Sequence, residues 1–261
     1  MHPGAVSTPL STESAVVAAA LSQQLRHGPT FPVVDPSTEE VLADVANMDG
    51  RAALTALSNA VAVQRSWAST SPQQRADILM RAYTLMIEST EDLALLMTLE
   101  MGKPLTESRG EVTYAAEFFR WFAGEAVRQD GGVMLAPDGG SRLIVTHRPV
   151  GPCLLITPWN FPLAMGTRKI GPALAAGCTC LVKPAEQTPL SMLALLGILR
   201  EAGVPDGVVS VITTADPGPT MAPLLADPRV RKLSFTGSTE VGRYLLTQCA
   251  PTVKRTSMEL G

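Results

Sequence analysis

The sequence has few of the residues that mark metal sites and redox pairs. Only three histidines and four cysteines occur among its 261 residues, and aromatic side chains make up 5%. The histidines lie far apart in the chain. The closest two cysteines, Cys178 and Cys180, have the spacing of neither a CxxC redox pair nor a zinc knuckle. We therefore predict no metal site, and we expect all four cysteines to be unreactive structural thiols, since free cysteine behaves as a small core residue.

Long apolar runs and concentrated positive charge are missing as well. No run reaches the roughly 20 apolar residues that cross a bilayer. The net charge of −3 argues against a nucleic-acid surface. Because the first 25 residues carry no Lys or Arg, we expect neither a secretory signal nor an Arg-rich transit peptide. These absences favour a cytoplasmic protein that binds neither membranes nor nucleic acids.

Hydrophobic residues make up 46% of the chain, which is enough for a substantial core. Residues 1–30 are predicted to form a loose arm, with a short helix over 15–25. Residues 31–140 predict a hairpin of two short strands followed by helices, and the stretch QDGGVMLAPDGGS near their end predicts turns. Residues 141–152 are strand-like. Residues 153–261 show a different, strictly alternating pattern.

This last region predicts the fold. Its short apolar strands are CLLIT, TCLVK, GVVSVI, RKLSF and VKRTSM, and helical segments separate them. Strands that alternate with helices are typical of an α/β protein with a Rossmann-like, doubly wound parallel sheet. Ligands of such sheets bind at the carboxyl ends of the strands, so the loops that follow the strands are the places to search for a site.

The loop in LSFTGSTEVG predicts a phosphate site. We expect the strand to end at Phe235, Gly237 to make a turn, and a helix to start near Ser238. Free amide groups at a helix N-terminus bind phosphate well. Glycine is also common at strand-to-helix turns that bind nothing, so a purely structural turn remains the alternative.

The loop in LVKPAEQTP places Lys183 at the end of a strand and Glu186 three residues later. Both side chains can hydrogen-bond ribose hydroxyls, and an acidic residue here would repel a 2′-phosphate, which favours NAD over NADP. The alternative is a solvated ion pair on the surface.

Two further loops carry candidates for chemistry. In ITPWNFP, two prolines hold Asn160 rigidly after a buried strand, and such an amide is a candidate oxyanion donor or, alternatively, a turn residue. In SMELG, Glu259 is predicted just beyond the last strand, where it is either a general base or a surface charge. All four loops fall at the same edge of the predicted sheet.

Three segments follow one another in the second half of the chain: ITPWNFPLAMGTRKIGPALAAGCTCLVKPAEQTPLS, KLSFTGSTEVGR and SMELG. In these segments, and upstream in MTLEMGKPLTESRGEVTYAAEFFRWFAGEA and RLIVTHRPVGP, the sequence resembles the aldehyde dehydrogenase superfamily. The resemblance covers roughly residues 31–261 and is greatest to succinate-semialdehyde dehydrogenases. It implies a Rossmann-like fold with an N-terminal helical region and a protruding β-hairpin, and a homo-oligomer in which residues 141–152 are the oligomerisation strand.

The resemblance also implies an activity, namely NAD(P)-dependent oxidation of a small aldehyde to an acid, with succinic semialdehyde as the expected substrate. By resemblance, Asn160 is the oxyanion donor and Glu259 the general base. Arg168 matches the arginine that some semialdehyde dehydrogenases use for the substrate carboxylate, and a guanidinium suits that task because it pairs with a carboxylate in bidentate fashion. The expected cofactor is NAD, with NADP as an alternative. Its contacts by resemblance are Trp159, Asn160, Lys183, Glu186, Gly237, Ser238 and Leu260.

The sequence departs from the family in one respect that bears on activity. The family's nucleophilic cysteine follows the ELGG motif, within which this sequence stops, and none of the four cysteines matches it. None is predicted at a helix N-terminus, where a thiol pKa is lowered. We therefore interpret residues 153–261 as the NAD-binding core of a first half that lacks the catalytic domain and is inactive alone. The alternatives are a non-catalytic NAD-binding fragment and a module that docks on a partner.

Overall fold

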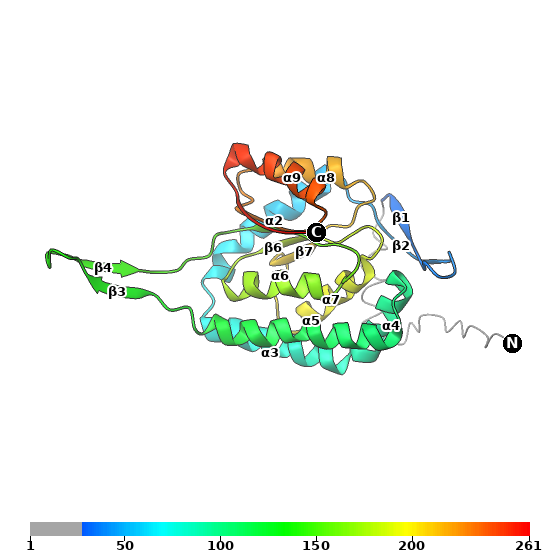
Figure 1. The fold of residues 1–261 in the computed structure, drawn as a ribbon, viewed down its shortest axis with the longest axis horizontal. Coiled ribbons are helices and arrows are strands. Elements are labelled where there is room, and N and C mark those ends of the chain that lie inside the picture. The colour runs from blue at the N-terminus through cyan, green and yellow to red at the C-terminus, as the bar shows by residue number, and fades with distance from the viewer. Residues whose placement is uncertain (1–27) are drawn as a thin grey trace.

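The computed structural model describes residues 28–261 (Figure 1). The predicted helix over 15–25 and most of the predicted arm lie outside these residues. No helix within the described range is both long and apolar enough to cross a membrane. The elements, in chain order, are β1 (Thr30–Val34), β2 (Val41–Ala46), α2 (Gly50–Ala68), α3 (Pro72–Glu88), α4 (Thr90–Met101), α5 (Leu105–Ala126), β3 (Gly132–Leu135), β4 (Arg142–Val145), β5 (Cys153–Ile156), α6 (Ala164–Ala175), β6 (Cys180–Lys183), α7 (Leu190–Glu201), β7 (Val209–Val211), α8 (Pro217–Ala226), β8 (Lys232–Gly237), α9 (Thr239–Cys249), the 3₁₀ turn η1 (Ala250–Thr252) and β9 (Arg255–Leu260).

The central sheet has five strands in the order β7-β6-β5-β8-β9, and every neighbouring pair is parallel. Helices separate the successive strands, so the predicted α/β fold with a parallel sheet is confirmed. Because all five strands run the same way, their carboxyl ends share one edge, as the loop argument requires.

Helices cover both faces of β5 and β6, since strand side chains point alternately to the two faces. Leu154, Ile156 and Leu181 pack in a core with residues of α2, α8 and α9. Leu155 and Val182, on the other face, pack with residues of α3 to α7. These strands are therefore apolar except for Lys183 at the end of β6, as is typical of strands buried on both sides.

The strand β8 differs, because it is apolar on one face only. Leu233 and Phe235 are buried in the core formed with α8 and α9. Lys232, Ser234 and Thr236 alternate with them and point to the opposite face, where they are only partly covered. This polar face of β8 continues onto β9 and forms the floor of a cavity that is described below.

Sequence-local signals account for the helix ends. Ser71 and Gln74 form a reciprocal capping box at the start of α3, with Pro72 in the first turn. Gly102 ends α4 with a φ of 86°, a left-handed conformation that favours glycine.

The strands β3 and β4 pair in antiparallel fashion and protrude from the body of the molecule (Figure 1). The prediction of turns throughout QDGGVMLAPDGGS was wrong, because residues 132–135 form β3. The Gly, Pro and Asp residues that flank VMLA concealed this strand, and only its pairing with β4 reveals it. Val133 and Ile144 are about 73% and 70% exposed, so this β-ribbon presents apolar side chains to solvent.

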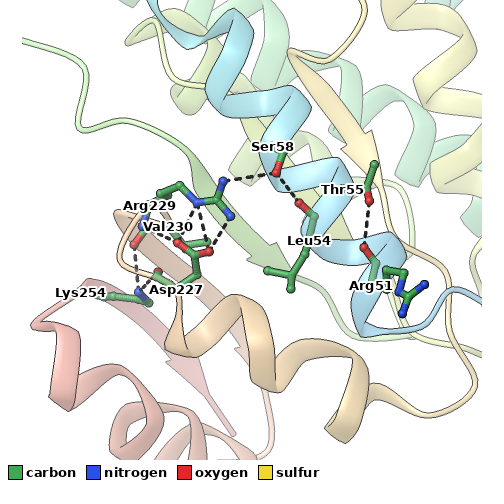
Figure 2. Close-up of polar contacts among 8 residues, drawn as sticks. All are labelled: Arg51, Leu54, Thr55, Ser58, Asp227, Arg229, Val230 and Lys254. Atoms are coloured by element: carbon green, nitrogen blue, oxygen red, sulfur yellow. Dashed lines mark hydrogen bonds and ion pairs between the residues drawn. The ribbon is translucent and has the colours of Figure 1, made fainter.

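A polar network ties α2 to the segment before β8 and to the start of β9 (Figure 2). The Arg229 guanidinium binds the Asp227 carboxylate at 2.7 Å and reaches Ser58 of α2 at 3.3 Å. The buried Lys254 ammonium donates to the backbone carbonyls of Asp227 at 2.6 Å and Val230 at 3.1 Å. Burial lowers the pKa of Lys254, and the carbonyl bonds compensate for its lost hydration. The network fixes the edge of the sheet that carries β9.

Two strand ends differ from prediction. β8 continues through Gly237 rather than ending at Phe235, and β9 includes Glu259 rather than stopping before it. The reason is mutual pairing, because Thr236 lies opposite Glu259 and Gly237 lies opposite Leu260. Glu259 is therefore held by a sheet ladder and is not on a loose exit.

Candidate functional site

A cavity of about 510 Å³ lies at the carboxyl ends of β5, β6 and β8, and we call it the nucleotide pocket. Its lining brings together five of the residues that the sequence predicts for cofactor binding, although they are up to 79 positions apart. These five are Trp159, Lys183, Glu186, Gly237 and Ser238.

Lys183 and Glu186 form an ion pair of 3.0 Å between Nζ and Oε2. The lysine side chain is only 7% exposed, so the alternative of a fully solvated surface pair is wrong. Burial acts to raise the pKa of Glu186, but the charge and hydrogen bond of Lys183 and other hydrogen bonds outweigh it and lower that pKa. The carboxylate therefore stays ionised beside the cavity.

The N-terminus of α9 faces this cavity. Ser238 is the N-cap, and its hydroxyl accepts from the Val241 amide at 3.3 Å. At two positions near this cavity, neighbouring side chains leave no room for a Cβ atom, so only glycine fits. A Cβ on Gly237 would lie 2.5 Å from the ring of Phe235, and a Cβ on Gly242 would lie 2.4 Å from the Leu260 side chain. The second contact shows that α9 packs closely against β9 at Gly242.

The sequence analysis missed the apolar part of the nucleotide pocket. Side chains of α8 and α9 line it, and they include Met221, Leu225, Val241 and Leu245. Such a slot suits a flat heterocycle such as adenine. Nothing in the sequence distinguishes these residues from ordinary core positions of two amphipathic helices, so only the placement of the helices reveals them.

A second cavity of about 510 Å³ lies between α6 and the polar face of β8 and β9, and we call it the sheet-face pocket. Arg168 and Lys169 of α6 and Glu259 of β9 line it. Phe235 contributes to both linings, so the two cavities lie on either side of the end of β8.

Hydrogen bonds connect the charged groups of the sheet-face pocket. Arg168 Nη1 lies 3.1 Å from Glu259 Oε1, and the Thr236 hydroxyl donates to the other carboxylate oxygen at 3.1 Å. Lys169 Nζ donates to Thr236 at 2.7 Å and to Ser234 at 3.2 Å. A continuous polar path therefore runs from Lys169 through Thr236 to Glu259.

Lys169 is a second residue that the sequence analysis missed. It is 8% exposed, and burial lowers its pKa to about 8, although the Glu259 charge acts in the opposite direction. A lysine with such a pKa exchanges protons readily near neutral pH. The available signal was the TRK triplet, in which only the arginine was assigned a role.

Asn160 is exposed and lies outside the linings of both cavities, as does Leu260. The backbone carbonyl of Asn160 accepts from Lys103 Nζ at 2.9 Å, and Lys103 forms a buried ion pair with Glu111. Glu111 also accepts from the amides of Leu163 and Ala164, both at 3.0 Å. A buried carboxylate on α5 thus caps α6 and anchors the loop that carries Asn160.

Glu100 does the same for α7. Its carboxylate accepts from the Leu190 amide at 2.7 Å and the Ser191 amide at 2.9 Å. The N-cap residue of α7, Pro189, makes no side-chain cap bond of its own. Sequence reasoning could not find either cap, since each donor and acceptor pair is separated by about 50 or 90 positions.

The sequence predicts four structural thiols, none at a helix N-terminus, and all four are buried. A hydrogen bond from Cys153 lowers the pKa of Cys178 to about 6, against the effect of burial. The pKa of Cys178 is lowered by a neighbouring thiol and not by a helix N-terminus. The position of the cysteines relative to the predicted helices therefore could not reveal it.

Comparisons with known proteins place the chain in a family. Residues 24–261 match the Aldehyde dehydrogenase family. The chain is 54% identical over 221 residues to a succinate-semialdehyde dehydrogenase of Paenarthrobacter nicotinovorans, which covers 85% of this chain and 49% of the relative. It is 48% identical over 238 residues to an NADP(+)-linked succinate-semialdehyde dehydrogenase of Escherichia coli K12, with 90% and 48% covered.

A solved betaine aldehyde dehydrogenase of Staphylococcus aureus in complex with NAD+ superimposes with a TM-score of 0.86 at 31% identity, covering 89% of this chain and 46% of that one. The chain spans about half the length of the relatives that it matches. The relatives thus include proteins linked to NAD and to NADP. With a match over nearly all of its described residues and a shared fold, the chain belongs to the aldehyde dehydrogenase family.

Proposed function

We propose that this chain is the cofactor-binding half of a dehydrogenase that oxidises a semialdehyde acid, namely succinic semialdehyde, with NAD. The observation that carries the proposal is the position of the two cavities on either side of the end of β8, where Phe235 lines both. One cavity has side chains that suit a dinucleotide, and the other has an arginine, a lysine and a glutamate. Hydride transfer requires that a cofactor and an aldehyde are held close together.

The nucleotide pocket fits NAD in its chemistry. Lys183 and Glu186 are proposed to bind ribose hydroxyls, and the N-terminus of α9 is proposed to bind the pyrophosphate. The apolar slot between α8 and α9 suits the adenine. When bound, NAD supplies the acceptor for a hydride. The ionised Glu186 supports NAD over NADP, because it would repel a 2′-phosphate.

In the sheet-face pocket, Arg168 is proposed to hold the carboxylate of the substrate. Glu259 is proposed as the general base, and its hydrogen bond with Thr236 links it to Lys169, which can pass a proton along the same path. Asn160 is proposed as the oxyanion donor, with its loop anchored by Lys103 and Glu111.

We propose further that residues 28–261 do not turn over substrate alone, because none of the cysteines matches the family nucleophile. The β-ribbon of β3 and β4, continued by residues 146–152, is proposed as an oligomerisation surface, since its exposed apolar side chains need a partner. The division at residues 31–140, 141–152 and 153–261 remains part of this proposal. The four free thiols support a cytoplasmic location.

Calorimetric titration of the purified chain with NAD, together with a turnover assay, tests the proposal. We expect saturable, weak NAD binding and no reduction of NAD by succinic semialdehyde above background. Absence of heat at millimolar NAD would contradict the cofactor assignment. Turnover above background would refute the predicted inactivity, and a chain that docks on a partner without binding NAD would favour the alternative of a docking module.

A further inference from the structure

Two thiols line the end of the sheet-face pocket. Cys153 is the first residue of β5, and Cys178 lies between α6 and β6. Their side chains are in hydrogen-bonding contact, and the residues are about 2% and 3% exposed. The pocket is therefore the route by which a small molecule can reach them.

The surroundings of the pair favour one negative charge, located on Cys178. The Cys153 thiol has two acceptors within reach, the Gly151 carbonyl at 3.4 Å and the Cys178 sulfur. The bond to Cys178, backbone hydrogen bonds from Gly151 and Val150, and the positive charge of Arg75 lower the pKa of Cys178 to about 6. The same bond, together with burial, raises the pKa of Cys153. Deprotonation of the pair is therefore favoured at Cys178 over Cys153.

The other two cysteines lack this combination. Cys180 is completely buried, its pKa is raised by burial, and it does not line the pocket. Cys249 is buried on the opposite face of the sheet in the core with α8, and burial raises its pKa as well. Reactivity of a cysteine requires both thiolate character and access. Cys180 and Cys249 therefore serve as internal controls.

We propose that Cys153 and Cys178 form an oxidisable dithiol, in which Cys178 attacks hydrogen peroxide that enters the sheet-face pocket and Cys153 then closes a disulfide. In the first step, the Cys178 thiolate attacks one peroxide oxygen, the O–O bond breaks, and the departing hydroxide takes up a proton and leaves as water. Cys178 becomes a sulfenic acid.

In the second step, the Cys153 sulfur loses its proton and attacks the Cys178 sulfur, and the S–O bond breaks. The hydroxide combines with the released proton and leaves as a second water. Two thiols are oxidised to one disulfide, and one hydrogen peroxide is reduced. The reaction needs neither NAD nor an aldehyde, so it does not depend on the proposed dehydrogenase function.

The experiment uses the whole purified chain, fully reduced and then exposed to hydrogen peroxide near pH 7. The remaining thiols are alkylated in denaturant, and the peptides are analysed by mass spectrometry. We expect a Cys153–Cys178 cross-linked peptide, lighter by two hydrogen atoms, with Cys180 and Cys249 alkylated. A Cys178→Ser variant should slow the loss of thiols by about tenfold or more. A Cys249→Ser variant should give the same yield of disulfide as the unchanged chain.

A Cys153→Ser variant separates the two steps, because it should leave Cys178 as a sulfenic acid that a cyclic 1,3-diketone traps. If that variant does not fold, as judged by circular dichroism, iodoacetamide labelling of the unchanged chain replaces it, and Cys178 should be labelled first. Retention of all four thiols, or a disulfide that includes Cys180 or Cys249 equally often, would overturn the proposal. Calorimetry of NAD on the same samples reports separately on the proposed function.

Discussion

Arg168 and Glu259 form an ion pair across the mouth of the sheet-face pocket, with 3.1 Å between Nη1 and Oε1. Their side chains are about 42% and 46% exposed, so the pair contributes about 1 kcal/mol or less to stability. A carboxylate ligand can therefore replace Glu259 at the guanidinium. In the proposed function, the glutamate and the substrate compete for Arg168, and binding of the substrate releases the base.

This competition predicts opposite effects of two substitutions on the binding of succinate, an unreactive analogue of the semialdehyde. Arg168→Gln should abolish measurable binding to the chain. Glu259→Gln should strengthen binding about threefold to tenfold, because it removes the competing carboxylate. Titration followed by NMR measures both. Arg109→Gln, which breaks the exposed pair with Glu91 elsewhere, serves as the control and should change nothing. Equal succinate affinity in all variants would exclude a carboxylate site at Arg168.

Glu186 should determine the choice between NAD and NADP. The Glu186→Gln variant loses the negative charge beside the ribose but keeps the size of the side chain, and it leaves Lys183 free to attract a 2′-phosphate. We expect the affinity for NADP relative to NAD to rise about tenfold. Parallel calorimetric titrations measure the ratio, and Glu201→Gln at the far end of α7 is the matched control. An unchanged ratio would show that Glu186 does not face the ribose.

Lys169 should titrate far below an ordinary lysine. After reductive methylation with ¹³C, its NMR signal should shift with a midpoint near pH 8, compared with the usual 10.5. The Lys169 signal is identified by its absence from the spectrum of the Lys169→Arg variant. In Glu259→Gln the midpoint should fall further, because the carboxylate that favours the charged ammonium is gone. A midpoint close to 10.5 would remove the basis for a proton path through Thr236.

Glu100 should make the chain less stable as the pH rises. Burial raises its pKa from 4.5 to about 7, so the folded chain holds a proton that the unfolded chain releases between these values. The stabilising contribution is complete below pH 4.5 and is lost as the pH rises through about 7. The full difference is on the order of 3 kcal/mol.

Denaturant unfolding at pH 5 and pH 8 tests this dependence. In Glu100→Gln, the free energy of unfolding should fall less between the two values than in the unchanged chain. Exposed Glu88, on α3, supplies the control substitution, which should leave the dependence unaltered. Identical pH dependence in Glu100→Gln and the unchanged chain would mean that Glu100 does not titrate in this range.

The sequence predicted the parts of the fold that local chemistry determines. Apolar strands between helices predicted the parallel sheet, because this signal involves neighbours in the chain. The strand β3 was missed, since its residues become a strand only by pairing with β4. Glu259 was placed beyond β9 for the same reason, as its partner Thr236 is 23 positions away.

Site residues at or just after the ends of strands could be predicted from the sequence. Site residues whose pKa is shifted by burial or by distant neighbours could not. Lys183 and Glu186 were found from their position after β6, and the structure pairs them. Lys169 and Cys178 have unusual pKa values because of groups on other elements, and no spacing in the sequence signals this. The buried caps provided by Glu100 and Glu111 likewise depend on contacts between distant helices.

The central claim is that a dinucleotide occupies the nucleotide pocket, and a crystal structure of the chain grown with NAD tests it most directly. The account predicts density for adenine between α8 and α9, a ribose within hydrogen-bonding distance of Lys183 and Glu186, and a pyrophosphate at the amides that follow Ser238. A dinucleotide bound elsewhere on the chain, with this pocket empty at saturating NAD, would contradict the account.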